Sequence, residues 1–340
     1  MIFLGDLACP SERVEYFNQA IDSLSVLSDE IVVVNLEAVI LDRHQVLKPE
    51  TLYNHPMVLD ALRHRAKKII VSLANNHMYD YPEAIITTRN RLEQQGIGVF
   101  GLQEPNGDIL PYEFRDGNIE YALFGHCWNL YSKTNPNKVN DIKIVDIEYS
   151  DFIKNVTHYI EQNPRRQVYC FMHWNYDLEK YPFPMHVKLS RDLIDAGVSG
   201  VIGSHSHRPH GVEIYKGRPI AYCLGNFYLP SGIYFDSKLS YPECSRKSIG
   251  ISIDSDNYKI LQFDTDTDIP VRFVSSTGFN QYDSLPNDNL KQYIRFFKKN
   301  RVKRLLVPVF NNYNGRAYNI KNWLAVHRVK LIKGITKLLR

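Results

Sequence analysis

Three histidines lie within the stretch "VIGSHSHRPHG", which begins with a short apolar run. His205 and His207 are two residues apart, so in an extended segment both rings would point to the same side, with Cα atoms about 6.6 Å apart. Imidazoles placed in this way can bind adjacent metal ions, or they can be polar residues of an ordinary loop. The stretch by itself does not decide between these interpretations.

Other residues with chemically useful side chains also follow apolar runs of strand length: Asp6, Glu37, Asn76, His77 and His173. Four of them have a structural alternative. Asp6 or Asn76 could cap a following helix, Glu37 could be a solvated loop carboxylate, and His173 could be packed in a core. Carboxylate, amide and imidazole groups bind borderline divalent metals, and two such ions about 3.5 to 4 Å apart can clamp a phosphoryl group. The whole set therefore favours a site for Zn²⁺, Mn²⁺ or Fe²⁺.

Apolar runs and stretches of helical pattern alternate along the first part of the chain, which predicts an α/β fold. The crevice beyond the carboxyl ends of the strands is where such folds bind ligands. Helical stretches at 82–96 and 186–197 end at glycines, as helix C-termini often do. The strand-like runs lie at 30–37, 67–77, 119–126, 166–174 and 198–205, and a further helical stretch lies at 11–24.

The later part of the sequence changes to hairpin-like pairs of strands. "VEIYKGRPIAYCLGNF" and "SIGISIDSDNYKILQFD" each hold two strand-like runs around a turn, which predicts antiparallel pairing. Residues 228–246 are expected to form a loop near the site. We divide the chain into a catalytic domain of residues 1–265, a linker of residues 266–288 and a basic, largely helical extension of residues 289–340.

Six segments, in order and spacing, resemble the CapA-type capsule or poly-γ-glutamate biosynthesis proteins, a branch of the calcineurin-like metallophosphoesterase superfamily. The resemblance covers roughly residues 1–265. It implies a four-layer α/β/β/α sandwich with mixed sheets. It also implies a metal-dependent hydrolase, most simply a phosphoesterase, that acts in the synthesis of a capsular or extracellular polysaccharide or of poly-γ-glutamate. The segments are "GDLAC", "NLEAVI", "LANNHMYDY", "MHWNYDLEKYPFP", "GSHSHRPHGVEIYKG" and "AYCLGNF".

The same resemblance implies roles for individual residues and one or two divalent ions as cofactors. Glu37 would stand where the superfamily has its bridging aspartate. His77 would stabilise or protonate the leaving oxygen, and Asp80 would orient the His77 ring. The first metal would be bound by Asp6 and His207, and the second by Asn76, His173 and His205.

The sequence departs from the superfamily pattern at two places. The superfamily opens with Asp-x-His, whereas the third position here is Ala8, which leaves the first metal one ligand short; Cys9 could supply a thiolate instead. Residues 175–177, Asn-Tyr-Asp, stand where the family more often has Gly-x-Glu, which would alter substrate contacts. The Ala8 gap keeps one alternative open, a non-catalytic assembly protein that holds a structural ion. The association with poly-γ-glutamate suggests another, an amide-bond hydrolase or transferase that acts on this polymer with one metal.

Three more residues are candidates for contact with substrate, each with an alternative. His126 ends a strand-like run and could equally be a packed histidine, and His210 could be a surface residue beyond the ligand motif. Asn226 lies in "LGNF", where the preceding glycine would allow the backbone to approach the site closely. Asn226 could then orient a metal ligand or belong to a plain turn.

Charge is distributed unevenly along the chain. Of the 41 Lys and Arg residues, 14 lie in 291–340, which has no Asp or Glu, so 27 basic residues face 37 acidic ones in the rest. The tail 319–340 predicts a basic amphipathic helix with leucines and isoleucines on one side (Leu324, Leu331, Ile335, Leu338 and Leu339) and Lys330, Lys333, Lys337 and Arg340 opposite. Such a helix could bind the inner face of a membrane or an acidic partner, or dock on its own domain.

The expected partners follow from this charge and from the family resemblance. We expect a phosphorylated or polyanionic surface-polymer precursor as substrate and no nucleic acid, because no recognised binding motif accompanies the basic residues. No run approaches the roughly 18 apolar residues that cross a bilayer, and the apolar start of the chain is too short for a signal segment. We therefore expect a cytoplasmic protein, peripheral at the inner membrane if the tail binds there.

Overall fold

The computed structural model describes residues 1–42, 51–133, 142–230, 232–234, 237–239, 241–255, 257–265, 271–286, 289–302 and 307–338, with the backbone alone at 132–133, 232–234, 237–239 and 329–338. Its α-helices are α1 (Val14–Asp22), α2 (Asp60–Arg65), α3 (Ile85–Gln94), α4 (Asn129–Lys133), α5 (Tyr149–Gln162), α6 (Pro184–Asp195), α7 (Leu290–Asn300) and α8 (Gly315–Leu338). Its short 3-10 helices are η1 (Ser11–Arg13), η2 (Ser25–Leu27), η4 (Asn76–Asp80), η5 (Pro82–Ala84), η6 (Glu243–Ser245) and η7 (Phe279–Gln281).

The strands of the described residues form two large sheets and two small ones. One large sheet has the order β18-β17-β16-β1-β2-β3-β4, with β13 also paired to β1, and the other has the order β11-β12-β10-β9-β7-β6. Both sheets are mixed. In the first, β1, β2 and β3 run parallel to one another, whereas β16 and β17 pair antiparallel. In the second, β9 and β10 run parallel, whereas β11 and β12 pair antiparallel. The strands are β1 (Ile2–Leu7), β2 (Ile31–Leu36), β3 (Lys68–Ser72), β4 (Gly98–Phe100), β5 (Leu102–Gln103), β6 (Tyr112–Asp116), β7 (Ile119–Cys127), β8 (Lys143–Ile144), β9 (Gln167–His173), β10 (Gly200–Ser204), β11 (Val212–Tyr215), β12 (Arg218–Ala221), β13 (Asn226–Tyr228), β14 (Gly232–Tyr234), β15 (Ser237–Leu239), β16 (Lys247–Asp254), β17 (Asn257–Asp264) and β18 (Arg272–Gly278).

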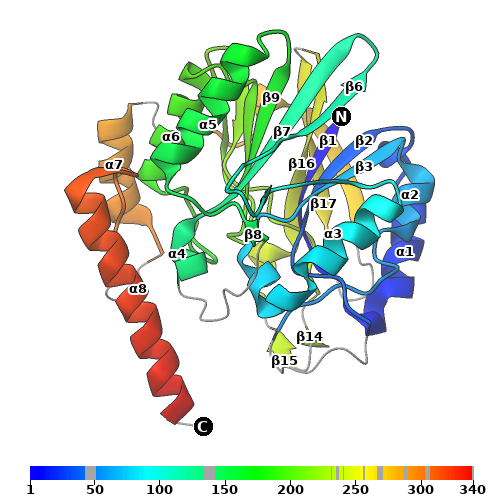
Figure 1. The fold of residues 1–340 in the computed structure, drawn as a ribbon, viewed down its shortest axis with the longest axis horizontal. Helices are drawn as coiled ribbons and strands as arrows, with labels where there is room; N and C mark the ends of the chain where they lie inside the picture. The colour runs from blue at the N-terminus through cyan, green and yellow to red at the C-terminus, as the bar shows by residue number, and fades with distance from the viewer. Residues whose placement is uncertain are drawn as a thin grey trace.

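The two large sheets pack face to face and are covered by helices on their outer faces (Figure 1). The inner core joins strands of both sheets, and the rings of Phe3 in β1 and Phe171 in β9 lie 6.0 Å apart. Helices α1, α2 and α3 cover the eight-stranded sheet, with Phe17 and Leu92 in its outer core. Helices α5 and α6 cover the six-stranded sheet, with Phe152 and Leu193 in the corresponding core. This is the expected α/β/β/α arrangement, and the fold class is confirmed.

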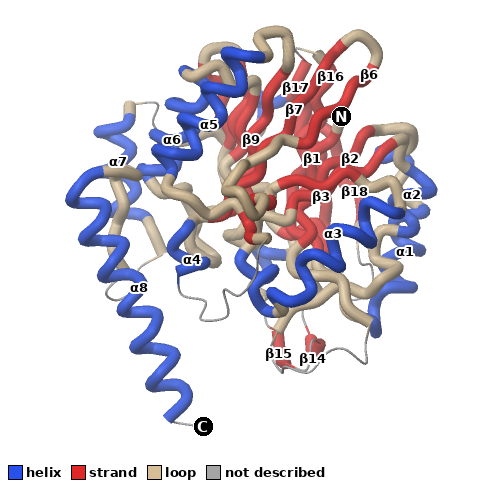
Figure 2. The backbone as a smooth tube through the Cα atoms, viewed as in Figure 1, coloured by secondary structure: helices blue, strands red, loops and turns tan. Residues whose placement is uncertain are grey.

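Figure 2 shows the strands gathered between the two helical layers. Because the central strands are covered on both faces, they are apolar along most of their length: all six residues of β1 and of β2 are buried. The helices predicted within 82–96 and 186–197 are α3 and α6, and Gly96 and Gly197 follow them with φ of 73° and 102°. The antiparallel pairing of the later strands is confirmed by β11 with β12 and β16 with β17.

The assignment of residues 266–288 to a linker is wrong for the described part of that range. Residues 272–278 form β18, which pairs antiparallel with β17 at the edge of the large sheet. Its residues are alternately exposed and half-buried, since an edge strand is covered on one face only, and this weak alternation gave no clear period in the sequence. The predicted loop at 228–246 contains β14, β15 and η6 among its described residues.

Two helices of the C-terminal extension lie beside the α5 and α6 layer (Figure 1). Tyr293 and Phe297 of α7 are buried in the core that α6 covers, and the Tyr293 hydroxyl donates to the Pro182 carbonyl at 2.7 Å. Tyr318 of α8 is buried as well. No helix in the described part of the chain is both long and apolar enough to cross a membrane.

Candidate metal centre

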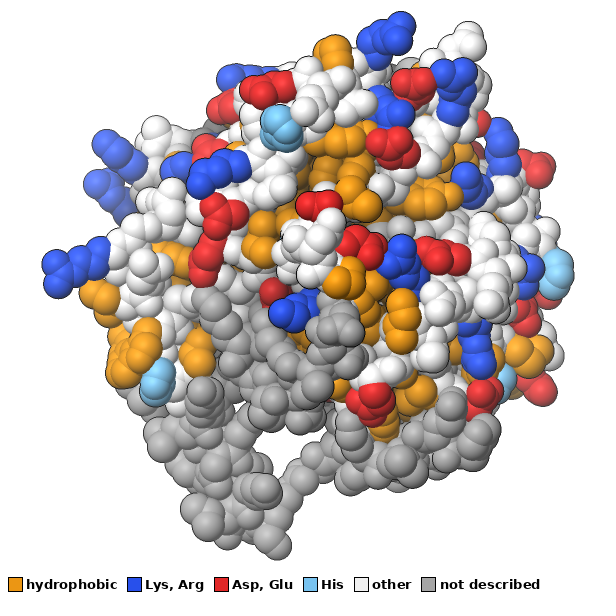
Figure 3. Space-filling view, viewed as in Figure 1, with side chains coloured by type: hydrophobic (Ala, Val, Ile, Leu, Met, Phe, Trp, Pro, Cys, Tyr) orange, Lys and Arg blue, Asp and Glu red, His pale blue; other side chains and the backbone are white. Residues whose placement is uncertain are grey.

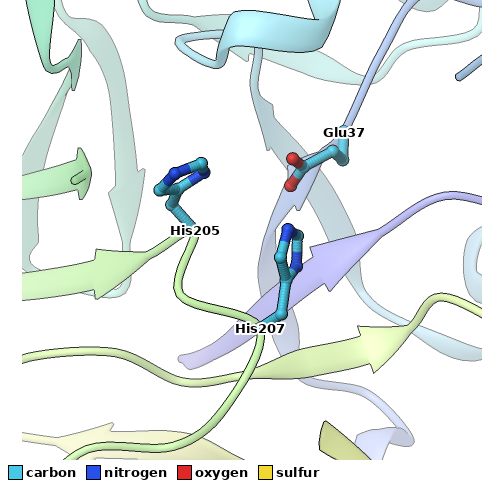
Figure 4. Close-up of side chains that lie close together, drawn as sticks. All are labelled: Glu37, His205 and His207. Atoms are coloured by element: carbon cyan, nitrogen blue, oxygen red, sulfur yellow. The ribbon is translucent and has the colours of Figure 1, made fainter. Parts of the chain in front are cut away.

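Five buried donor side chains meet where strands of both sheets end. Asp6 lies near the end of β1, Glu37 follows β2, and His173 ends β9. His205 and His207 follow β10, which runs parallel to β9. All five residues are no more than 5% exposed. Figure 4 shows Glu37, His205 and His207 pointing toward one common space.

Glu37 is the residue that links these donors. Among the described residues, ligand atoms of Asp6, Glu37 and His173 lie within 4.8 Å of one another, and so do those of Glu37, His205 and His207. The resemblance implies that Glu37 serves two ions, and both groups include it. The grouping differs from the implied one in two respects, because His173 lies with Asp6 rather than with His205, and His207 lies with His205 rather than with Asp6.

The unsatisfied polar atoms of the cluster fit a metal ion. Glu37 Oε1 and His205 Nδ1 are buried and have no hydrogen-bond partner among the described residues. Burial of a carboxylate without compensation is costly, and burial together with the neighbouring Asp6 raises the pKa of Glu37. Burial also lowers the pKa of His173, which favours the neutral form that binds metals. A divalent cation would satisfy all of these groups.

The loop that carries His205 and His207 does not have the extended geometry predicted for it. The φ angles of His205 and His207 are 91° and 56°, so both residues occupy the left-handed region and the alternation of an extended chain does not apply. The backbone N–H of His205 donates to Asp6 Oδ2 at 3.0 Å, which ties the loop to β1. The two rings nevertheless reach the same site, with centroids 5.7 Å apart.

Glycines allow β1 to meet the segment before β13 beside Asp6. The Asp6 N–H donates to the Gly225 carbonyl at 3.0 Å. A Cβ at Gly5 would lie 1.9 Å from that carbonyl oxygen, and Gly225 has φ of 77°. The close backbone approach predicted from "LGNF" is therefore present.

The residues after β3 face the cluster from η4. Asn76 Oδ1 lies 2.8 Å from His173 Nε2. His77 has its Nδ1 at 2.8 Å from Asp80 Oδ2 and its Nε2 at 3.8 Å from Glu37 Oε1, and its side chain is 27% exposed. Burial lowers the pKa of His77, but the Asp80 carboxylate outweighs this, so the net shift is upward. Asp80 also accepts from the Leu52 N–H at 3.0 Å, which fixes its orientation.

The three candidate substrate contacts have different surroundings. The His126 ring is buried between Tyr149 and Phe152 and donates from Nε2 to the Ile147 carbonyl at 2.8 Å, the position of a packed histidine. His210 is buried, so the surface alternative for it is wrong, and its Nε2 donates to the Glu179 carbonyl at 2.7 Å. Burial lowers the pKa of both rings to about 4.

Asn226 has contacts that fit the orienting role considered for it. His207 Nδ1 lies 2.9 Å from Asn226 Oδ1, and a carbonyl-type oxygen accepts. The His207 ring then carries its proton on Nδ1 and presents Nε2 to the site.

Among the described residues, neither Ala8 nor Cys9 supplies the missing ligand. Ala8 is fully buried, and its N–H donates to the Tyr228 carbonyl at 2.8 Å. Cys9 is buried, its pKa is strongly raised by burial, and it belongs to neither donor group of the described chain. A buried, protonated thiol is a poor metal ligand.

Sequence reasoning missed the amide network beneath the carboxylates. Asn35 Nδ2 donates to Asp6 Oδ1 at 2.8 Å and to Glu37 Oε2 at 3.0 Å. Asn75 Nδ2 donates in turn to Asn35 Oδ1 at 3.3 Å and to the Leu36 carbonyl at 2.9 Å. The signal was present in "NLE", because Asn35 stands two residues before Glu37 and alternate residues of a strand share a face.

Replacing Asn35 by alanine is expected to weaken divalent-metal affinity by about 10- to 100-fold, because both carboxylates lose the donor that orients them. Calorimetric titration of the metal-free protein with Mn²⁺ and Zn²⁺ measures this effect. The matched control is Asn18→Ala, which removes an asparagine of α1 whose side-chain amide donates to the Met57 carbonyl in an exposed contact. An Asn35→Ala protein that binds as tightly as this control would rule out the orienting role.

Aromatic and acidic side chains surround the histidines. The Tyr131 ring lies 4.2 Å from that of His205, and the Tyr241 ring lies 5.3 Å from that of His207. Asp177 Oδ1 lies 3.1 Å from His205 Nε2, and the Asp177 side chain is 59% exposed. The Asn-Tyr-Asp departure noted in the sequence thus brings a carboxylate next to the donor cluster.

The fold and the site together define an α/β/β/α protein with a donor cluster suited to divalent metals, shared between the ends of two sheets. The chain belongs to the family described as "Bacterial capsule synthesis protein PGA_cap", whose sequence profile matches residues 8–231.

Named relatives agree with this assignment. The chain is 24% identical over 186 residues to the "PGA biosynthesis protein CapA" of Bacillus subtilis, a match that covers 48% of this chain and 43% of that protein. It is 23% identical over 177 residues to the "Capsule biosynthesis protein CapA" of Bacillus anthracis, covering 48% and 40%. The matches thus span less than half of these relatives.

Two solved structures align with the chain at low sequence identity. A putative 5'-nucleotidase from Staphylococcus aureus aligns at 10% identity with a TM-score of 0.43, covering 88% of this chain and 57% of that one. A hypothetical protein from Thermus thermophilus aligns at 13% identity with the same TM-score, covering 81% and 96%.

Proposed function

We propose that this protein is a metal-dependent phosphoesterase that acts in the synthesis of a capsular or extracellular polysaccharide or of poly-γ-glutamate. The observation that supports the chemistry most directly is the pair of donor groups that share Glu37, with buried atoms of Glu37 and His205 left without hydrogen bonds among the described residues. The family and the names of the Bacillus relatives support the biosynthetic role.

In such a reaction some residues bind the metal ions and another transfers a proton. Asp6, Glu37, His173, His205 and His207 would hold one or two divalent ions, with the Asn76 oxygen next to His173. Ions bound here lower the pKa of water and polarise phosphoryl oxygens. Manganese, zinc and iron all suit this donor set.

His77 is the proton donor in this proposal. It is partly exposed beside Glu37, and Asp80 holds its Nδ1. The Nε2 edge can therefore protonate or stabilise the leaving oxygen. The substrate is a phosphorylated or polyanionic polymer precursor.

The test combines metal analysis with turnover. Purified protein is loaded with Mn²⁺ or Zn²⁺, its metal content is measured, and hydrolysis of aryl phosphates and of γ-glutamyl amides is followed with and without a chelator. We expect bound metal and chelator-sensitive phosphate release. One tightly held ion with no turnover of either substrate would instead identify a non-catalytic assembly protein, and turnover of the amides alone would identify an amide hydrolase.

A further inference from the structure

Among the side chains of helix α8 that the structure describes, those buried against the body share one face. Tyr318, Asn322 and Ala325 are at most 6% exposed. The Tyr318 hydroxyl donates to Asn129 Oδ1 at 3.2 Å. Residues 318, 322 and 325 follow the spacing of one helix face, so the opposite face is turned away from the protein.

The opposite face of α8 is apolar and exposed. Ile320, Trp323 and Leu324 are 51%, 58% and 47% exposed, and their spacing places them on adjacent turns of the helix. The exposed His327 ring lies 4.0 Å from that of Trp323. The other large hydrophobic side chains that the structure describes as exposed lie on separate elements or loops. Figure 3 shows hydrophobic side chains and a histidine gathered at the left edge, above the grey part of the chain.

This face was expected to be the apolar side of the tail, and Leu324 belongs to it. In the sequence Leu331, Ile335 and Leu338 follow Leu324 at intervals of 7, 11 and 14, which continues the same helix face. Their side chains, and those of Lys330, Lys333 and Lys337, lie outside the described part, as do residues 339 and 340. The helix backbone itself runs on to Leu338 and extends past the body (Figure 1).

The surroundings of this face are basic. Residues 291–340 hold 14 Lys and Arg and no Asp or Glu. Arg316 is exposed at the start of α8, and Lys298 and Lys299 are exposed at the end of α7. Lys and Arg side chains stand near the hydrophobic patch in Figure 3.

We propose that the exposed face of α8, defined by Ile320, Trp323 and Leu324, binds the surface of an anionic lipid membrane. An apolar stripe with a tryptophan, flanked by basic residues, is the pattern of helices that lie in the membrane interface. The anionic headgroups complement the uniformly basic segment, and the apolar side chains enter the acyl boundary. An acidic protein would satisfy the charges without accounting for an apolar stripe that continues along the helix.

Tryptophan fluorescence provides a direct test on the full chain. The chain has three tryptophans, and Trp128 and Trp174 are fully buried, so an emission shift on adding vesicles reports Trp323. With vesicles of phosphatidylglycerol and phosphatidylcholine in equal parts we expect a blue shift and co-sedimentation, and with phosphatidylcholine alone we expect much less of both. No blue shift with anionic vesicles overturns the proposal.

A triple variant separates insertion from simple charge attraction. Ile320→Ser with Trp323→Ser and Leu324→Ser is expected to reduce the apparent vesicle affinity by at least about tenfold, because the apolar area that enters the membrane is lost. The matched control, Leu110→Ser with Val274→Ser, removes exposed apolar side chains from other parts of the chain and leaves binding unchanged. Circular dichroism confirms folding of each variant. Equal binding by the triple variant and the control would show adsorption by charge alone and would contradict the proposal.

Discussion

Replacing His77 by alanine is expected to lower kcat for phosphate-ester hydrolysis by about 100- to 10,000-fold, the usual contribution of a positioned acid or base. His77 is partly exposed at the cluster, its Nδ1 is held by Asp80 at 2.8 Å, and its Nε2 lies 3.8 Å from Glu37 Oε1. Because His77 belongs to neither donor group of the described chain, the variant should keep the metal content of the wild type.

The dependence on the leaving group distinguishes this role from a structural one. If His77 protonates the leaving oxygen, the loss should be small for an aryl phosphate with an acidic phenol and should grow for alkyl phosphates, whose oxygens need the proton more. Steady-state rates for a series of esters measure this trend. The control is His64→Ala, at an exposed histidine of α2. An equal decrease in kcat for all esters of the series, or a loss of bound metal, would show that His77 has a structural role and does not protonate the leaving oxygen.

The backbone that carries the donors could be predicted because its physical causes are local. Glu37 and His173 adjoin runs apolar enough to be buried on both faces, and such runs predict parallel central strands whose carboxyl ends meet. The side chains at these strand ends then lie close together because of the order and direction of the strands. Periodicity cannot assign donors to individual ions: the resemblance implied that Asp6 pairs with His207, whereas the structure groups Asp6 with His173.

What could not be predicted depends on tertiary packing. The left-handed conformations of His205 and His207 have no local sequence signal, since neither is a glycine. A terminal histidine of an apolar run looks the same whether it is packed, as His126 is, or faces the site, as His173 does. A helical wheel of the tail shows which residues share a face. It cannot show which face packs against the body, because that depends on the contact of Tyr318 with Asn129, a residue far away in the sequence.

The C-terminal extension is joined to residues 174–183 between β9 and α6, here called the site loop, by an ion pair whose disruption is expected to cost about 3 to 5 kcal/mol of unfolding free energy. Glu179 is fully buried, and the Arg301 side chain is 8% exposed, with Arg301 Nε at 3.8 Å from Glu179 Oε2. Glu179 Oε1 accepts from the Val302 N–H at 2.8 Å. The Arg301 guanidinium also lies 5.6 Å from the centre of the Phe183 ring. Removing either charge leaves the other buried without this partner.

The same contact connects the extension to the loop beside His205. Glu179 lies two residues after Asp177, which neighbours His205, and the Leu178 N–H donates to the Ser206 carbonyl between the two metal-site histidines at 2.9 Å. A loosened Glu179 would therefore free the loop on which Asp177 is carried. We expect the single variants to lose metal affinity as well as stability.

Urea unfolding of Glu179→Gln, Arg301→Met and the double variant measures the pair. Each single change should cost about 3 to 5 kcal/mol, while the double variant should recover most of the loss, because a neutral polar and an apolar side chain of similar volume leave no unpaired charge. Lys154→Met is the matched control, since Lys154 and Asp151 form an exposed pair with side chains 76% and 54% exposed, which should contribute about 1 kcal/mol or less. Single variants no less stable than this control, or a double variant as unstable as the sum of the singles, would show that the buried pair does not hold the extension to the site loop.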